Sequence, residues 1–178
     1  MKRALLTTCM SLMTITGATF AADVPPLPGA GGAHQFDGKW VLDKKASPSF
    51  QVAPAALTQQ FKTDGDKLII RSNYEQPKDG MYPIFWIGVM TEELQLQPDG
   101  KELVSNIGPY QYISKTTQED KKLVTDWTAN LANGDTQGKV EGQWIRTLSP
   151  DGKQMTMEMS GKCSDGRQMQ ATLVFHRK

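Results

Sequence analysis

The feature that most constrains this chain is an alternation of apolar and polar residues running from Gln35 to Lys178. A period of two is typical of β-strands with one buried face. Asp-Gly pairs at 64–65, 99–100, 151–152 and 165–166 interrupt the alternation, and this dipeptide permits the positive φ angles of tight hairpin turns. We therefore predict strands at 35–43, 56–63, 67–73, 82–90, 92–97, 101–107, 110–117, 121–130, 139–149, 154–162 and 168–177.

Many short strands separated by turns are typical of an antiparallel sandwich or barrel. Consecutive hairpins favour an up-and-down barrel, because antiparallel neighbours need only tight connections. Ala53 to Gln60 is the one plausible short helix. No linker interrupts residues 35–178, so we predict a single all-β domain there.

The first 22 residues have the three parts of a secretory signal peptide. Lys2 and Arg3 are followed by an uncharged run to Phe20 and by the small residues Ala21 and Ala22. A transmembrane helix is the alternative, but the apolar run is short for a span of roughly 20 residues. We predict export, to the periplasm or the medium. Residues 23–34 are rich in Pro and Gly and predict a flexible linker.

The charge balance argues against a nucleic-acid-binding function. Lys and Arg number 20 against 19 Asp and Glu, so the basic excess of a nucleic-acid-binding protein is missing. Loss of Lys2 and Arg3 would leave 18 basic residues against 19 acidic ones. The same cleavage would remove Cys9 and leave Cys163 without an internal disulfide partner. Cys163 is then either a small, partly buried residue or a thiol used for dimerisation or reaction.

Aromatic residues on several predicted strands are candidates to line a ligand cavity inside the barrel. They are Phe61, Trp86, Tyr110, Tyr112, Trp127 and Trp144. Arg71 and Arg146 each interrupt an apolar strand, and an inward-facing arginine would bind a carboxylate through two hydrogen bonds. The alternative is that both arginines face solvent.

The segment from Tyr82 to Met90 is apolar on both faces of its predicted strand. Either a second layer buries it, or it forms an exposed surface for a ligand, a membrane or a protein partner. A partner would use Ile84, Phe85, Ile87 and Val89. Pro83 argues against a central place in a sheet.

Met155, Met157 and Met159 share one strand face. Thioethers select Cu(I), and the alternative is a core-facing strand filled by adaptable methionines. We predict no cofactor. Catalytic motifs such as a nucleophile elbow or a metalloprotease His-Glu-x-x-His are missing from the sequence, which makes an enzyme the less favoured class. Asp126 and Glu141 are the only acidic residues we consider for the interior.

The first and last strands resemble a known family. Residues 36–42, FDGKWVL, with the turns at 149–153 and 164–167 and the final stretch Leu173 to Phe175, resemble small exported bacterial lipocalin-like proteins, whose functions are mostly uncharacterised. The resemblance implies a calycin-type barrel. It further implies that Trp40, positioned by Gly38, closes one end against Arg177.

The sequence thus favours a noncatalytic barrel that binds a small apolar or amphipathic molecule. The alternative is a protein–protein interaction module that uses residues 84–90. A lesser alternative is Cu(I) binding by the three methionines.

Overall fold

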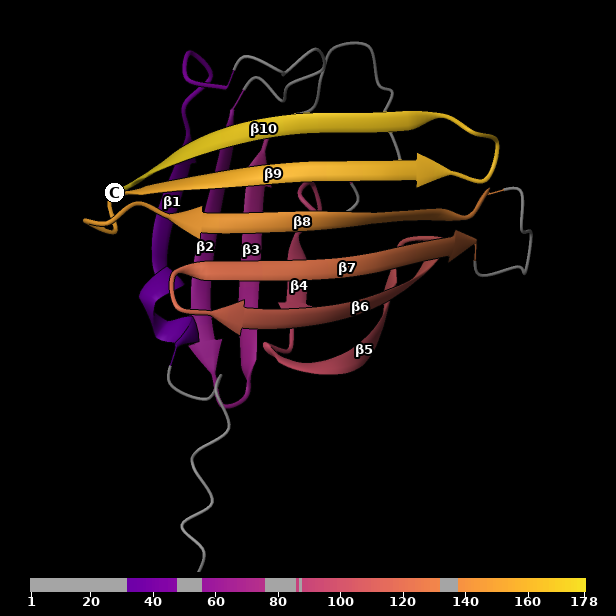
Figure 1. The fold of residues 1–178 in the computed structure, drawn as a ribbon, viewed down its shortest axis with the longest axis horizontal. Coiled ribbons are helices and arrows are strands. Elements are labelled where there is room, and N and C mark those ends of the chain that lie inside the picture. The colour runs from indigo at the N-terminus through magenta and orange to yellow at the C-terminus, as the bar shows by residue number, and fades with distance from the viewer. Residues whose placement is uncertain (1–31, 48–55, 76–85, 87, 132–137) are drawn as a thin grey trace, which may run out of the picture.

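A computed structural model describes residues 32–47, 56–75, 86, 88–131 and 138–178 of the chain. Apart from one short 3-10 helix, the regular structure in this part of the chain consists of β-strands (Figure 1). The elements are η1 (Ala33–Phe36), β1 (Gly38–Leu42), β2 (Leu57–Asp64), β3 (Lys67–Tyr74), β4 (Glu93–Leu96), β5 (Asp99–Ile107), β6 (Tyr110–Glu119), β7 (Lys122–Leu131), β8 (Val140–Leu148), β9 (Gln154–Cys163) and β10 (Gln168–Arg177).

The strands form one antiparallel sheet in the order β4-β3-β2-β1-β10-β9-β8-β7-β6-β5. Consecutive strands pair with each other except β4 and β5, and β1 also pairs with β10. The described ladders leave β4 and β5 unpaired with each other. In Figure 1, strands β6 to β10 run across the front, and β1 to β3 run behind them almost at right angles. The predicted all-β, up-and-down, calycin-type barrel is therefore confirmed.

Hairpin geometry follows from the turn residues that the sequence provides. Gly65 joins β2 to β3 with φ of 60°, and Gly152 precedes β9 with φ of 67°. Both values lie in the left-handed region that glycine enters without steric cost. The turns fix the register, and the register decides which alternate side chains face inward.

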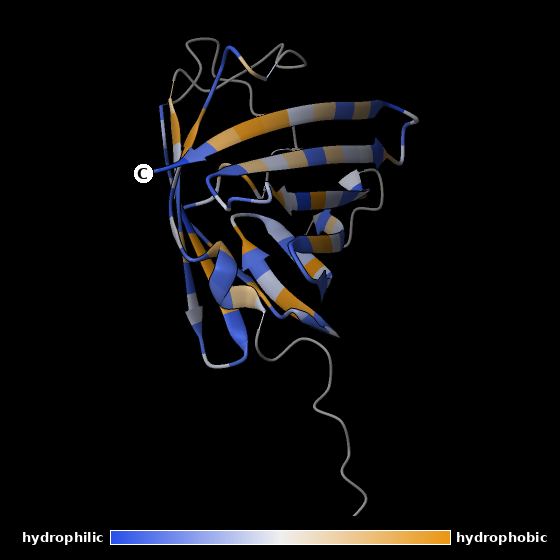
Figure 2. Cartoon of the chain, turned by 60° about the vertical axis from the view of Figure 1, so that its left-hand side comes forward, coloured by the Kyte–Doolittle hydropathy of each residue, from blue (hydrophilic) through white to orange (hydrophobic). Residues whose placement is uncertain are grey.

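The inner face of β6 to β10 is a regular grid of buried residues. Register pairs Leu123 of β7 with Arg146 of β8, and Arg146 with Met157 of β9. The next row on the same face lies two residues away along each strand. It consists of Thr125, Trp144 and Met159. Figure 2 shows the resulting bands of apolar and polar residues along each strand.

Three predicted elements differ from the structure. The plausible helix at Ala53 to Gln60 is wrong over its described part, because Leu57 to Gln60 belong to β2. Residues 35 and 36 belong to η1 rather than to the first strand, and η1 also takes in Ala33 and His34. The described part of the predicted strand 82–90 is a turn, in which the amides of Val89 and Met90 both donate to the carbonyl of Trp86. Its described residues Trp86, Val89 and Met90 are buried in this turn, and a continuous apolar run does not distinguish a turn from a buried strand.

Candidate ligand-binding site in the barrel interior

Arg146 is the central feature of the barrel interior. It lies on the inward face of β8 between Trp144 and Leu148, and its relative exposure is 0%. Among the described residues it is the only charged side chain that is buried. Lys, Arg, Asp and Glu are almost never fully buried without a partner.

The guanidinium of Arg146 has no hydrogen-bond partner among the described residues. Its Nε, Nη1 and Nη2 atoms are all buried and unpaired. The guanidinium lies near two aromatic rings: its Cζ is 5.3 Å from the ring centroid of Trp144 and 6.0 Å from that of Phe61. Such cation–π contacts compensate only part of the cost of burying an ion.

Burial lowers the pKa of Arg146 from 12.5 to about 10, and the neighbouring Tyr112 opposes only part of this shift. The guanidinium therefore stays protonated at neutral pH and remains a fixed positive charge. Burial also raises the pKa of Tyr112, and the Arg146 charge opposes this only in part. The Tyr112 hydroxyl is consequently a neutral group, and it too is buried without a partner.

Trp144, which contacts the arginine, belongs to a cluster of three aromatic rings. The ring centroids of Trp127 and Trp144 are 5.2 Å apart, and Tyr112 lies 6.1 Å from the first and 6.0 Å from the second. Both indole Nε1 atoms are buried and unpaired. The Trp127 ring packs directly over Gly142. A side chain at position 142 would clash with it, because a Cβ there would lie 2.8 Å from the ring.

The turn that contains the described residues 86 and 88–90 lies against this aromatic cluster. A Cβ on Gly88 would lie 1.6 Å from Trp144, so the backbone of the turn lies directly on the indole edge. Trp86, Val89 and Met90 are buried with it. The prediction of an exposed partner surface is wrong for Val89, whereas Ile84, Phe85 and Ile87 lie outside the described residues.

The other aromatic candidates occupy different positions. Phe61 is buried on β2 and faces Arg146 across the barrel. Tyr110 is only partly buried and packs against the edge of the core. Arg71, the second predicted anchor, faces outward: its side chain is 67% exposed and pairs with Glu93 at 2.9 Å.

Trp40, Gly38 and Arg177, for which the family resemblance implies barrel closure, lie close together in the structure. The Arg177 Cζ lies 4.7 Å from the Trp40 ring centroid, and the two residues are register partners. The Trp40 indole donates to the Phe36 carbonyl at 2.8 Å. Gly38 has φ of 132° and sits against the Arg177 side chain.

The three methionines of β9 face the interior. Met155, Met157 and Met159 are all buried. A Cu(I) ion held there would be next to the uncompensated charge of Arg146, the register partner of Met157. Among the described residues, no group of three His, Cys, Asp or Glu side chains could hold a metal.

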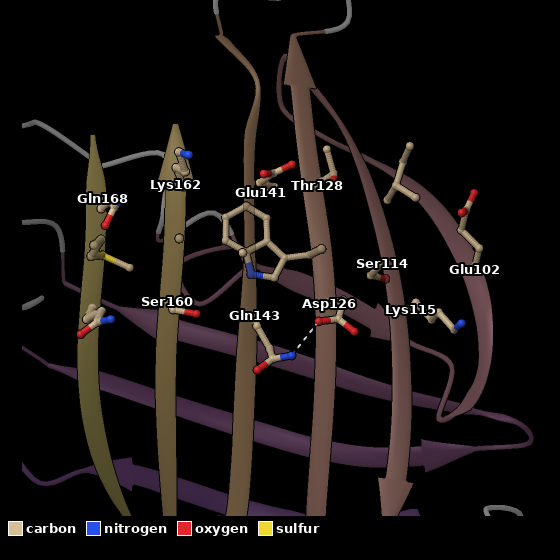
Figure 3. A pocket seen from close by; sticks show the side chains of 16 residues that line it. Glu102, Ser114, Lys115, Asp126, Thr128, Glu141, Gln143, Ser160, Lys162 and Gln168 are labelled. Carbon is tan, nitrogen blue, oxygen red and sulfur yellow. Dashed lines mark hydrogen bonds between the residues drawn. The ribbon is translucent and has the colours of Figure 1, made fainter. Parts of the chain in front are cut away.

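A pocket of about 570 Å³ on the opposite, outer face of β6 to β10 has a different character (Figure 3). Its lining mixes both charge signs, with Lys115 and Lys162 beside Asp126 and Glu141. Gln143 donates to Asp126 at 2.8 Å. The two carboxylates considered for the interior therefore face solvent.

Several interior polar residues carried no role in the sequence prediction. Thr116 and Thr125 are buried and share a hydrogen bond of 3.0 Å between their hydroxyls. Gln59 is buried on β2 and its Oε1 atom is unpaired. The alternation of the strands could have predicted that these side chains face inward, because each lies two residues from another inward-facing side chain.

No family model matches this chain, and no curated protein matches it. A secretory abundant heat soluble protein of Ramazzottius varieornatus is similar in structure, with TM-score 0.52 and 9% identity over 84% of this chain and 99% of that one. The likeness is one of fold. Secretory abundant heat soluble protein 4 of the same organism (TM-score 0.46, 11% identity, 83% and 97% covered) and the Echinococcus granulosus fatty-acid-binding protein 1 (TM-score 0.45, 11% identity, 81% and 98% covered) are more distant. Within the described ranges, no helix has the length and apolar character needed to cross a membrane.

Proposed function

We propose that this protein binds a small amphipathic monoanion noncatalytically inside its barrel, with the anionic head on Arg146. The observation that carries the proposal is the fully buried guanidinium with three unpaired nitrogens. A carboxylate could accept hydrogen bonds from two of the Arg146 N–H groups, and its negative charge would neutralise the guanidinium. The apolar part of the ligand would contact Phe61 and Met157.

The charge balance of the interior supports a single negative charge on the ligand. Arg146 is the one buried charged residue in the described part of the barrel. A monoanion neutralises it, whereas a dianion would leave one buried negative charge unpaired, at a cost of several kcal/mol.

The test compares an acid with a neutral analogue of the same length. Ligand-stripped protein is titrated with dodecanoate and with dodecanol, and tryptophan fluorescence reports binding. A hydrogen-bonded charge pair contributes about 1.5–3 kcal/mol, so dodecanoate should bind roughly ten- to a hundredfold more tightly. Equal affinities for the acid and the alcohol would refute a role for Arg146.

Two variants separate a site effect from a general charge effect. Arg146→Met should abolish the preference for the acid. Arg71→Met removes an equally charged but exposed side chain and should leave the preference unchanged.

We also infer that the chain is exported. The support is the pattern of residues 1–22, which lie outside the described part of the structure. Fractionation of host cells, with mass spectrometry of the mature N-terminus, tests it. A full-length chain retained in the cytoplasm would overturn it.

A further inference from the structure

The interior contains more hydrogen-bond donors than a simple carboxylate needs. Beyond the Arg146 guanidinium, the Nε1 atoms of Trp127 and Trp144 and the Tyr112 hydroxyl are buried and unpaired. Leaving a buried donor unsatisfied costs about 1–3 kcal/mol. Two indoles and a phenol without partners in one cluster therefore indicate a second polar subsite made of neutral donors.

Among the residues that the structure describes, the neighbouring side chains do not supply the missing acceptors. The hydroxyl of Thr125, the register partner of Trp144, is already paired with Thr116 at 3.0 Å. Gly142 and Met159 flank the same two indoles; glycine has no side chain, and the methionine thioether is a weak acceptor.

One neutral donor, Trp144, lies beside Arg146, and the second indole, Trp127, packs against Trp144. The Trp144 ring is 5.3 Å from the Arg146 Cζ atom, and the Trp127 ring is 5.2 Å from Trp144. A ligand whose head is bound by Arg146 would therefore pass the indoles with the part of its chain nearest the head.

We propose that the preferred ligand is an amphipathic monocarboxylate with an uncharged acceptor oxygen, such as an oxo group, near its head, rather than a plain saturated acyl chain. This inference rests on the proposed function. The oxygen would accept from the indole N–H groups of Trp127 and Trp144. It is uncharged because the single guanidinium is already neutralised by the carboxylate.

The test measures the affinity of dodecanoate against a series of oxododecanoates that differ in the position of the oxo group. In the wild-type protein the best oxo acid should bind about tenfold more tightly than dodecanoate, the effect of satisfying one or two buried donors. The double variant Trp127→Phe/Trp144→Phe keeps aromatic rings but lacks both donors, so its ratio should fall to near one.

Trp40→Phe is the matched control, because its indole is already bonded to the Phe36 carbonyl. This variant should lose stability but keep the wild-type affinity ratio. If the double variant does not fold, indole N–H resonances of wild-type protein provide the readout: two should shift downfield with the oxo acid and not with dodecanoate.

The outcomes separate the two proposals. Equal affinity for oxo and plain acids in wild-type protein, or an advantage that persists in the double variant, overturns the acceptor subsite. If Arg146→Met still weakens dodecanoate binding in that case, the proposed function stands. If neither acid binds in an Arg146-dependent way, the proposed function fails as well.

Discussion

Replacing Arg146 by methionine should make the ligand-free protein more stable. The side chain is fully buried, and its pKa falls from 12.5 to about 10. Each pKa unit corresponds to about 1.4 kcal/mol between the charged and neutral forms. Burial of the guanidinium therefore costs the folded state about 3 kcal/mol at neutral pH.

Part of this gain is offset. The variant loses the cation–π contacts with Trp144 and Phe61, which together contribute up to about 2 kcal/mol. Methionine has a similar length and packs against irregular surroundings. We expect a net stabilisation of about 1–3 kcal/mol, equivalent to roughly 3–10 °C in Tm for a domain of this size.

The assay is urea unfolding followed by tryptophan fluorescence, on protein refolded after extraction under denaturing conditions and checked by mass spectrometry for residual ligand. Arg71→Met is the control, because exposed substitutions change stability by about 0.5 kcal/mol or less. A lower unfolding midpoint for Arg146→Met would refute the reasoning, since it would mean that the guanidinium is compensated in the free protein. Added dodecanoate should narrow or reverse the difference, because it binds the wild-type protein more tightly and therefore stabilises it more.

Three further predictions follow from the same geometry. Gly142→Ala would place a Cβ 2.3 Å from the Ser160 carbonyl. It should lower the free energy of unfolding by more than about 2 kcal/mol, the upper range of overpacking effects. The control Gly65→Ala has open space around its Cβ but a φ of 60°, and it should cost only about 1 kcal/mol in the same urea titration. Anion binding to Arg146 should be constant through neutral pH and weaken as pH rises through about 10, where the free guanidinium deprotonates; calorimetric titration at increasing pH measures this, and a loss beginning near pH 7 would contradict it. Burial raises the pKa of Cys163, so a thiol reagent at neutral pH should react far more slowly with native than with urea-unfolded protein, and equal rates would show that the thiol is accessible.

The hairpins were predictable because their signals are local. Asp-Gly pairs at 64–65 and 151–152 fix two of the turns, and alternation then determines most strand limits to within two or three residues. The turn at 86–90 was not predictable, since its burial depends on contact with Trp144, which is distant in sequence.

The inward orientation of Arg146 was also only partly predictable. Its neighbour Ile145 is apolar, so the alternation of β8 leaves two phases open. The register with Leu123 and Met157, both inward, decides between them. For Arg71 the adjacent Ile70 is buried, and the same argument places the arginine outside. The missing partners of Arg146 are visible only once the whole barrel is assembled.

The pairing of β1 with β10 has a consequence for the timing of folding. Trp40 and Arg177 are register partners although almost the whole described chain separates them. Contacts of such long sequence separation form late, because they require closure of a long loop. The ribosome must therefore release the last strand before the barrel can close and bury Arg146. The sequence predicts export for this chain; an exported chain that crosses the membrane before its barrel closes would meet its ligand only after translocation.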